Sequence, residues 1–279
     1  MASPLVVDPG RAARRAPTRQ ESPVLCYGVC AGPSDKAERI ALPGIRASDP
    51  SGYVLVRRGE RSIFTAYNSM LDEAAALGAE ALVLVHDDVQ LRDPRLPTTL
   101  SEVFADGSVG LVGVIGGTGV RDLRWWEHAS VGYAEEVGRT LDYGRGQHEA
   151  EVVDGIFLAL PRRAFGLVRF DEGTFTGFHG YDADISCQVA ARGLRVVTAD
   201  VDLLHHTKPT AIKGPNAHRL ANLLWLAKWH PPATAAGRRL LRARTALARR
   251  AATLPALERV PGRLVDPVLW SSSRRRRHP

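Results

Sequence analysis

Short apolar runs alternate with segments whose apolar residues recur at helical spacing along most of this chain. Runs at residues 24–30, 53–56 and 81–85 predict buried strands, because parallel strands covered on both faces read as continuous apolar segments. Residues 63–77 carry apolar side chains at helical spacing, and Ser62 precedes them as a candidate N-cap. The first third of the chain is therefore expected to alternate strands with a helix.

The same alternation continues through the middle of the chain, with one irregular segment. Residues 121–149 hold several glycines and aromatic residues without a period, which indicates a loop or a pair of extra strands that covers a site. Alternating units of this size predict an α/β fold, in which a mixed, mostly parallel sheet is flanked by helices. The remaining predicted elements are strands at 109–115, 151–160 and 194–199 and a helix at 182–192. The glycines of 116–119 are expected to interrupt the regular structure after the first of these strands.

Residues after position 212 are expected to form a helical extension. Helical spacing runs over 217–230, two prolines follow, and a second, arginine-rich helix covers 233–252. The expected organisation is a mobile arm at 1–22, a main domain at 23–212, a helical extension at 213–256 and a basic tail at 257–279.

Composition is that of an ordinary globular protein, but the charge is uneven. The 279 residues are 44% hydrophobic and 24% charged, which allows a sizeable core. Residues 237–279 hold twelve Arg against Glu258 and Asp266, a local charge of +10, so the net charge of +7 leaves −3 for the rest of the chain. The apolar stripe of the basic helix favours an anionic membrane surface over nucleic acid as its partner. The alternative is that this end is solvated and partly disordered.

The cysteines and the hydropathy of the chain indicate a reducing compartment. Cys26, Cys30 and Cys187 lack a second closely spaced pair, so a zinc ribbon is not expected and free thiols are. No segment has the apolar length of a signal peptide or the roughly 18 apolar residues of a membrane-spanning helix. We expect a cytoplasmic protein, attached at most to the cytoplasmic face of a membrane.

The first candidate site is His86-Asp87-Asp88, which ends an apolar strand. Ligands of open α/β sheets bind beyond the carboxyl ends of the strands, and two carboxylates there favour a divalent cation. Such an ion would bridge phosphate oxygens and neutralise charge on a leaving group. The alternative is that one Asp caps a turn and the other is solvated.

The second candidate site is the segment from Phe178 to Asp184, which leads into a helix. Asp182 stands at the helix start and is the candidate general base, since an acceptor hydroxyl needs a base within hydrogen-bonding reach. The neighbouring His179 and Tyr181 are suited to line a sugar pocket. Helix capping by Asp182 alone is the alternative.

The third candidate site is His205-His206, which follows the last core strand, where a neutral imidazole would fit a metal site with Asp88. Single histidines are more often ordinary surface or core residues. Further candidates with open alternatives are Tyr67 and Asn68, which would touch a nucleotide or pack; Asp154-Gly155, which would bind an acceptor or form a turn; and Trp125 and Trp126, which would stack on a sugar or lie under a lid.

These motifs, in this order, resemble the family-2-like glycosyltransferases. The resemblance covers about residues 24–207 and is greatest to a branch with a His-x-Asp-Val strand end and a Phe-His-x-Tyr-Asp-x-Asp loop. The residues that carry it are Tyr67-Asn68, His86-Asp87-Asp88-Val89, Val153-Asp154-Gly155, Phe170-Asp171-Glu172, Gly177 to Asp184, and a Gly193-led strand that ends in His.

The resemblance implies a GT-A fold, a nucleotide-diphosphate sugar donor, Mn²⁺ or Mg²⁺, and inversion at the anomeric carbon. Asp88, with Asp87, would bind the metal and the diphosphate, and Asp182 would be the base. His206 matches the family's metal-binding His better by its distance from Gly193, with His205 as the second choice. The chain departs from the family in having Tyr181 before Asp182 and His86 in place of the first Asp of an Asp-x-Asp.

The sequence therefore predicts a glycosyltransferase whose acceptor belongs to cell-surface polysaccharide or glycoconjugate synthesis. One rival is a metal-dependent sugar nucleotidyltransferase, which needs a Gly-rich loop and a basic residue near the first strand. Residues 31–35 read Ala-Gly-Pro-Ser-Asp, which argues against it. The second rival is a binding protein with a degenerate sugar site, whose basic tail binds lipid or nucleic acid.

Overall fold

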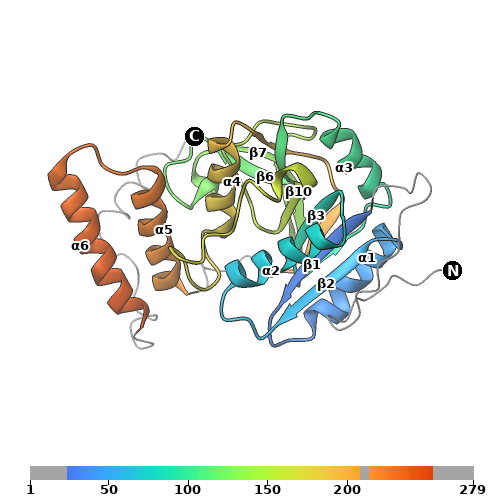
Figure 1. The fold of residues 1–279 in the computed structure, drawn as a ribbon, viewed down its shortest axis with the longest axis horizontal. Coiled ribbons are helices and arrows are strands. Elements are labelled where there is room, and N and C mark those ends of the chain that lie inside the picture. Colours follow the sequence, from blue (N-terminus) through green and yellow to red (C-terminus); the bar gives the residue numbers. More distant parts are fainter. Residues whose placement is uncertain (1–23, 208–213, 254–279) are drawn as a thin grey trace.

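A computed structural model describes residues 24–207 and 214–253 of the chain as two six-stranded sheets with flanking helices. The expected arm at 1–22 and the basic tail at 257–279 lie outside the described residues. Figure 1 shows the sheets in the centre of the molecule and the last two helices at one end. The predicted α/β class is confirmed.

The first sheet is mixed and mostly parallel, with the order β11-β5-β10-β3-β1-β2. Strand β1 pairs in parallel with β2 and β3, and β5 pairs in parallel with β11, whereas β10 is antiparallel to both of its neighbours. Strands β1, β3, β5 and β10 are almost wholly buried, as continuous apolar runs predict, whereas the edge strand β2 is buried only at Val54 and Leu55. Their bounds are β1 Leu25–Ala31, β2 Tyr53–Arg58, β3 Ala81–His86, β5 Val109–Gly113, β10 Phe157–Pro161 and β11 Arg195–Thr198.

The second sheet is mostly antiparallel and was only partly expected. The pair β7–β8 agrees with the second of the two alternatives for 121–149, a pair of extra strands, and β12 follows the last predicted core strand and ends at His205. The sheet has the order β4-β12-β7-β6-β9, with β8 on β7. Its strands are β4 Val89–Leu91, β6 Ile115–Thr118, β7 Ala129–Glu136, β8 Arg139–Tyr143, β9 Val152–Val153 and β12 Leu203–His205.

Two predicted strands are wrong in their extent, because the chain crosses from one sheet to the other within them. The run at 109–115 is divided between β5 and β6, and the expected break at 116–119 is mostly strand. The glycines there permit close backbone approach, since a Cβ on Gly116 would lie 2.2 Å from the Val152 carbonyl oxygen. The run at 151–160 is likewise divided into β9 and β10 by a turn at Asp154-Gly155.

The helices predicted from periodicity are present, and two short ones were missed. Helix α2, Ile63–Ala76, begins as expected, with the Ser62 hydroxyl accepting a hydrogen bond from the Phe64 N–H. The missed helices are α1, Leu42–Ser48, which follows a π-helical turn at Ala37–Ala41, and α3, Leu96–Phe104. Helix α1 is too short to show a helical period, whereas α3 carries Leu96, Leu100, Val103 and Phe104 at helical spacing, a pattern that was missed in the sequence. The later helices are α4 Tyr181–Ala191, α5 Pro215–Trp229 and α6 Ala235–Ala252.

Helix α5 joins the C-terminal helices to the body of the molecule. The Trp229 indole N–H donates to Asp184 Oδ1 (2.8 Å), and the Lys228 ammonium pairs with Asp171 and Asp184. The Asn222 amide oxygen accepts from the Leu123 N–H (2.9 Å), within the loop before β7. Helix α6 packs on α5 and forms the outer end of the molecule (Figure 1). None of the helices in the described ranges is long and apolar enough to cross a membrane.

Candidate metal and donor site

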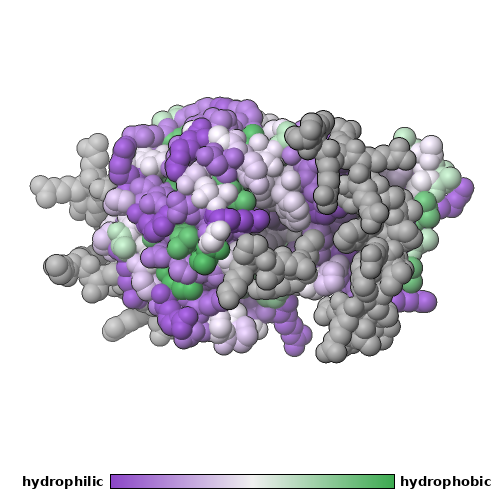
Figure 2. Space-filling model, turned by 180° about the vertical axis from the view of Figure 1, so that it is seen from behind, coloured by the Kyte–Doolittle hydropathy of each residue, from purple (hydrophilic) through white to green (hydrophobic). Residues whose placement is uncertain are grey.

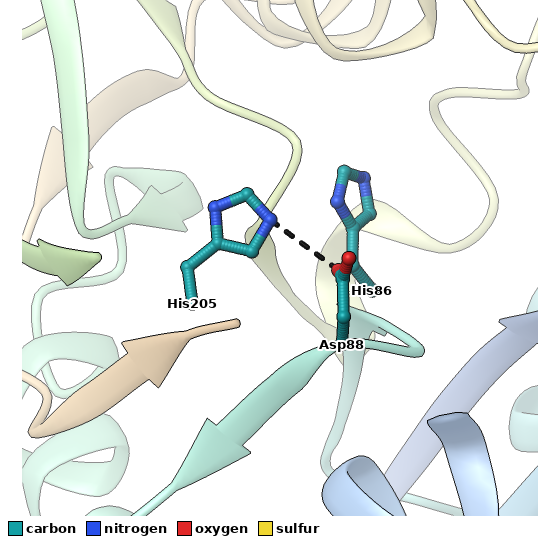
Figure 3. Close-up of side chains that lie close together, drawn as sticks. All are labelled: His86, Asp88 and His205. Atoms are coloured by element: carbon teal, nitrogen blue, oxygen red, sulfur yellow. Dashed lines mark ion pairs between the residues drawn. The ribbon is translucent and has the colours of Figure 1, made fainter. Parts of the chain in front are cut away.

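Three potential metal ligands meet where the two sheets adjoin. His86 is the last residue of β3, Asp88 precedes β4, and His205 ends β12, which pairs with β4 so that His205 lies opposite Val89. One ligand atom from each of the three side chains lies within 4.8 Å of the others (Figure 3). Pairing between distant segments thus assembles a His-Asp-His group at the carboxyl end of β3.

Asp88 is the charged centre of this group. Its Oδ1 lies 3.3 Å from His205 Nε2, and its Oδ2 lies 2.8 Å from Lys36 Nζ. Burial would raise the pKa of Asp88, but the hydrogen bonds from His205 and Lys36 outweigh burial and hold that pKa well below its usual range. Asp88 is therefore an anion with lone pairs for a cation.

The outer nitrogen of each histidine faces an oxygen atom. The Tyr181 hydroxyl lies 2.6 Å from His86 Nε2 and donates its hydrogen to the Gly155 carbonyl oxygen (3.1 Å). His86 Nε2 must then carry the hydrogen, which leaves Nδ1 of the neutral ring unprotonated, and Figure 3 shows one ring nitrogen of His86 turned toward His205. His205 Nδ1 is buried without a hydrogen bond, 3.5 Å from Glu136 Oε1.

This arrangement fits a divalent metal ion. Metal-bound histidines usually donate the other ring N–H to a carboxylate or another oxygen acceptor, and His86 and His205 each have such an oxygen in place. Asp88 supplies a hard oxygen ligand between them, a donor set that leaves coordination positions for phosphate oxygens. His86 was absent from the predicted ligands; its position at a strand end beside Asp88 was the available signal.

His206 and Asp87 lie outside this group. His206 Nε2 is 3.0 Å from Gln90 Oε1, and its backbone N–H donates to the Asp88 carbonyl oxygen. The structure thus places His205, the second choice for the metal-binding histidine, beside His86 and Asp88, where the sequence favoured His206. The Asp87 carboxylate accepts from the Gly32 N–H (2.9 Å) and so orders the loop after β1.

Asp182 lies in the first turn of α4. Its Oδ2 accepts from the Gly155 N–H (3.2 Å), and its Oδ1 accepts from the Ala183 N–H (2.9 Å). Burial and the nearby Asp154 carboxylate raise the pKa of Asp182 from 3.8 to about 7. A carboxylate with this pKa is suited to accept a proton near neutral pH.

Tyr181 and Asp184, on either side of Asp182 in the second candidate site, have structural roles. Tyr181 is buried, and it contacts His86 and Gly155 instead of lining an open pocket. A Cβ on Gly155 would lie 2.0 Å from the Tyr181 hydroxyl oxygen, so only glycine fits there. Asp184 is fully buried among hydrogen bonds from α5 and Gln188.

The remaining candidates divide between core and surface. Tyr67 is fully buried, and the Asn68 amide bonds both backbone groups of Phe170, which agrees with the packing alternative for this pair. Trp125 is buried and donates to Asp154 Oδ2 (3.0 Å), while Trp126 is 44% exposed.

Asp154 also forms the expected turn, since its Oδ1 accepts from the Ile156 N–H. His179 is half-buried, with its ring 5.4 Å from that of His218 on α5, and the preceding Phe178 is 53% exposed. Of the aromatic residues expected to line a sugar pocket, Trp126 is therefore the exposed one. Phe178, which was not among them, is exposed as well.

Comparisons with known proteins identify the family of the chain and support its fold. The sequence model of a glycosyltransferase-like family matches residues 50–219. The Streptomyces griseus streptomycin biosynthesis protein StrF is 38% identical over 205 residues, which cover 71% of this chain and 72% of StrF. A crystal structure of GalNAc-T7 with UDP, GalNAc and Mn²⁺ matches with a TM-score of 0.55 at 11% identity, which supports the expected fold. That match covers 85% of this chain but only 52% of the GalNAc-T7 chain.

Proposed function

The chain belongs to the glycosyltransferase-like family, and on this premise we propose that it transfers a sugar from a nucleoside-diphosphate donor to a hydroxyl acceptor, with inversion at the anomeric carbon. The observation that carries the proposal is the His86–Asp88–His205 group at the end of β3. Asp182, a carboxylate suited to act as a base, lies one residue from Tyr181, which contacts His86.

His86, Asp88 and His205 would hold Mn²⁺ or Mg²⁺, and GalNAc-T7, which shares the fold, was solved with Mn²⁺ and UDP. A bound divalent ion supplies charge neutralisation for the donor diphosphate. Asp182 accepts the hydrogen-bonded proton of the acceptor hydroxyl. The acceptor oxygen then forms a bond to the anomeric carbon, the bond from that carbon to the diphosphate breaks, and its electron pair leaves with the nucleoside diphosphate.

The acceptor is proposed from StrF, which is more similar in sequence to this chain than GalNAc-T7 is. StrF is described as a streptomycin biosynthesis protein, which favours a small-molecule acceptor of a biosynthetic pathway over the cell-surface polysaccharide expected from the sequence. The exposed Trp126 and Phe178 offer aromatic surface on which a sugar ring of such an acceptor would stack.

Release of nucleoside diphosphate from a panel of nucleotide sugars, with small hydroxyl-bearing and sugar-bearing acceptors, tests this function. We expect Asp88→Asn and Asp182→Asn each to lose at least about 100-fold in turnover. Asp142→Asn, at an exposed carboxylate on β8, should retain the activity. Product of inverted anomeric configuration in the NMR spectrum supports the one-step mechanism. Unchanged turnover in both site variants contradicts the assignment, and pyrophosphate release from nucleoside triphosphates would indicate the nucleotidyltransferase.

Helix α6 supports a second proposal, contact with an anionic membrane surface at the cytoplasmic face. The helix carries six arginines and no acidic residue, and Leu240 and Leu247 are 61% and 55% exposed. Figure 2 shows hydrophobic and hydrophilic surface side by side at this end of the molecule. An apolar stripe beside arginines is typical of helices that lie in a lipid interface.

Sedimentation with vesicles that contain anionic lipid tests this contact. The double variant Leu240→Ser, Leu247→Ser should sediment less than the wild type, and neutral vesicles should bind neither protein. Equal sedimentation of the wild type, the double variant and a chain that lacks residues 237–279 would contradict membrane contact.

A further inference from the structure

A lysine close to the first strand lies against the proposed metal ligand. Strand β1 runs parallel to β3, with Cys30 opposite His86, so the loop that follows β1 adjoins the turn that holds Asp88. The Gly32 N–H bond to Asp87 connects the two segments. Lys36, at the end of this loop, places its Nζ 2.8 Å from Asp88 Oδ2.

This ion pair puts a positive charge on a carboxylate that a metal ion would also use. The two Asp88 oxygens face His205 and Lys36, so an ion bound by Asp88 has to approach with the ammonium group close by. Like charges this close repel each other, and the repulsion is stronger in a partly buried site than in water. Metal binding therefore favours a conformation in which Lys36 has moved away.

The lysine is able to move, and the donor offers it a partner. Its side chain is 35% exposed, and a lysine ammonium is a compact charge with three donors on a flexible stem. A nucleotide-diphosphate sugar brings phosphate oxygens to the metal, and one more negative charge develops on the diphosphate as the sugar leaves. Charge-assisted hydrogen bonds from lysine to phosphate are among the stronger polar contacts of proteins.

We propose that Lys36 is a donor-binding residue that pairs with Asp88 in the metal-free protein and moves to the donor diphosphate when the metal and the nucleotide bind. The proposal rests on the proposed function and adds to it a residue that no candidate motif contained. It requires that loss of the Lys36 charge has opposite effects on two affinities. Metal binding becomes tighter, because a competitor of the ion is removed, and nucleotide binding becomes weaker.

Two titrations of the whole protein test this. Free Mn²⁺ is followed by electron paramagnetic resonance without nucleotide, and nucleoside diphosphates are titrated by calorimetry at saturating Mn²⁺. Lys36→Met should bind Mn²⁺ up to about 5-fold more tightly, the range of a partly exposed ion pair. It should bind the preferred nucleoside diphosphate about 10-fold or more weakly, as expected for a lost hydrogen bond to a charged group.

Two further variants make the result decisive. Lys36→Arg keeps the charge and should restore most of the nucleotide affinity. Arg39→Met removes an exposed positive charge that pairs with Asp35, close to Lys36 in the chain, and should change neither affinity. Weaker Mn²⁺ binding by Lys36→Met, or nucleotide affinity within 2-fold of the wild type, would overturn the role of Lys36. Absence of nucleotide binding by the wild-type protein would instead overturn the proposed function.

Discussion

Replacement of Asp182 by Asn should stabilise the metal-free protein increasingly as the pH rises. The pKa of Asp182 is about 7 in the folded protein, where burial and Asp154 raise it, against 3.8 without these effects. Between these values the folded state binds more protons than the unfolded state, so this carboxyl costs stability as the pH rises through the window. The amide of the Asp182→Asn variant does not titrate, so the substitution removes that cost.

The size of the effect follows from the two pKa values. At 1.36 kcal/mol per unit, linkage gives a cost of about 1.7 kcal/mol at pH 5 and about 4 kcal/mol at pH 8. The amide also loses one of the two backbone hydrogen bonds that Asp182 accepts, from Gly155 and Ala183, but this loss does not depend on pH. The stability of the variant relative to the wild type should therefore rise by about 2.5 kcal/mol from pH 5 to pH 8.

Urea denaturation in EDTA at pH 5, 6, 7 and 8 measures this difference, with the slopes of the transitions compared to check that both proteins unfold alike. Asp72→Asn is the matched control. A hydrogen bond from Arg169 lowers the pKa of Asp72 below 3.8, so Asp72 is ionised throughout this pH range. The difference in stability between Asp72→Asn and the wild type should therefore be constant from pH 5 to pH 8. A relative stability of Asp182→Asn that is constant with pH would refute the raised pKa, and with it the electrostatic argument for Asp182 as the base.

Three substitutions test the contacts around the site. Gly155→Ala places a methyl group against the Tyr181 hydroxyl and should cost about 1–3 kcal/mol in urea denaturation, with wild-type stability as the contrary result. Tyr181→Phe removes the oxygen that faces His86 Nε2 and should lower Mn²⁺ affinity about 10-fold in a spectroscopic titration, whereas unchanged affinity would mean that the hydroxyl does not orient the ring. Asn222→Ala leaves the buried Leu123 N–H without its acceptor and should lower the melting temperature by the equivalent of about 1–3 kcal/mol; an unshifted transition would show that water replaces the amide.

The positions of the strands of the first sheet could be predicted, although not the bounds of β5 and β10, because each strand contains an apolar run. Burial on both faces leaves this pattern in the sequence, and α2 adds a helical period with a capping serine. The second sheet leaves a weaker pattern, since β7 and β8 are partly exposed and β9 is two residues long. The crossover within 109–118 was missed because its glycines, which permit close approach of the backbones, have the sequence pattern of a turn.

In the site, too, the residues with a local sequence pattern could be predicted, and the contacts between distant segments could not. Its position at a strand end made Asp88 a candidate, because ligands of open α/β sheets bind beyond the carboxyl ends of the strands, and its position at a helix start made Asp182 a candidate. The choice between His205 and His206 depends on how β12 pairs with β4, which a distance along the chain does not determine. Lys36 reaches Asp88 from 52 residues away, and no local pattern indicates that contact.

Metal-dependent binding of a nucleotide tests the central claim most directly. Thermal unfolding of the wild type and of Asp88→Asn would be followed with a panel of nucleoside diphosphates, each with Mn²⁺ or with EDTA. We predict that one nucleotide at about 100 times its dissociation constant stabilises the wild type by about 2.7 kcal/mol with Mn²⁺, and that the shift disappears with EDTA or in Asp88→Asn. Folded wild-type protein that shifts with no nucleotide, or equally with Mn²⁺ and EDTA, would contradict the claim that His86, Asp88 and His205 bind a metal ion for the sugar donor.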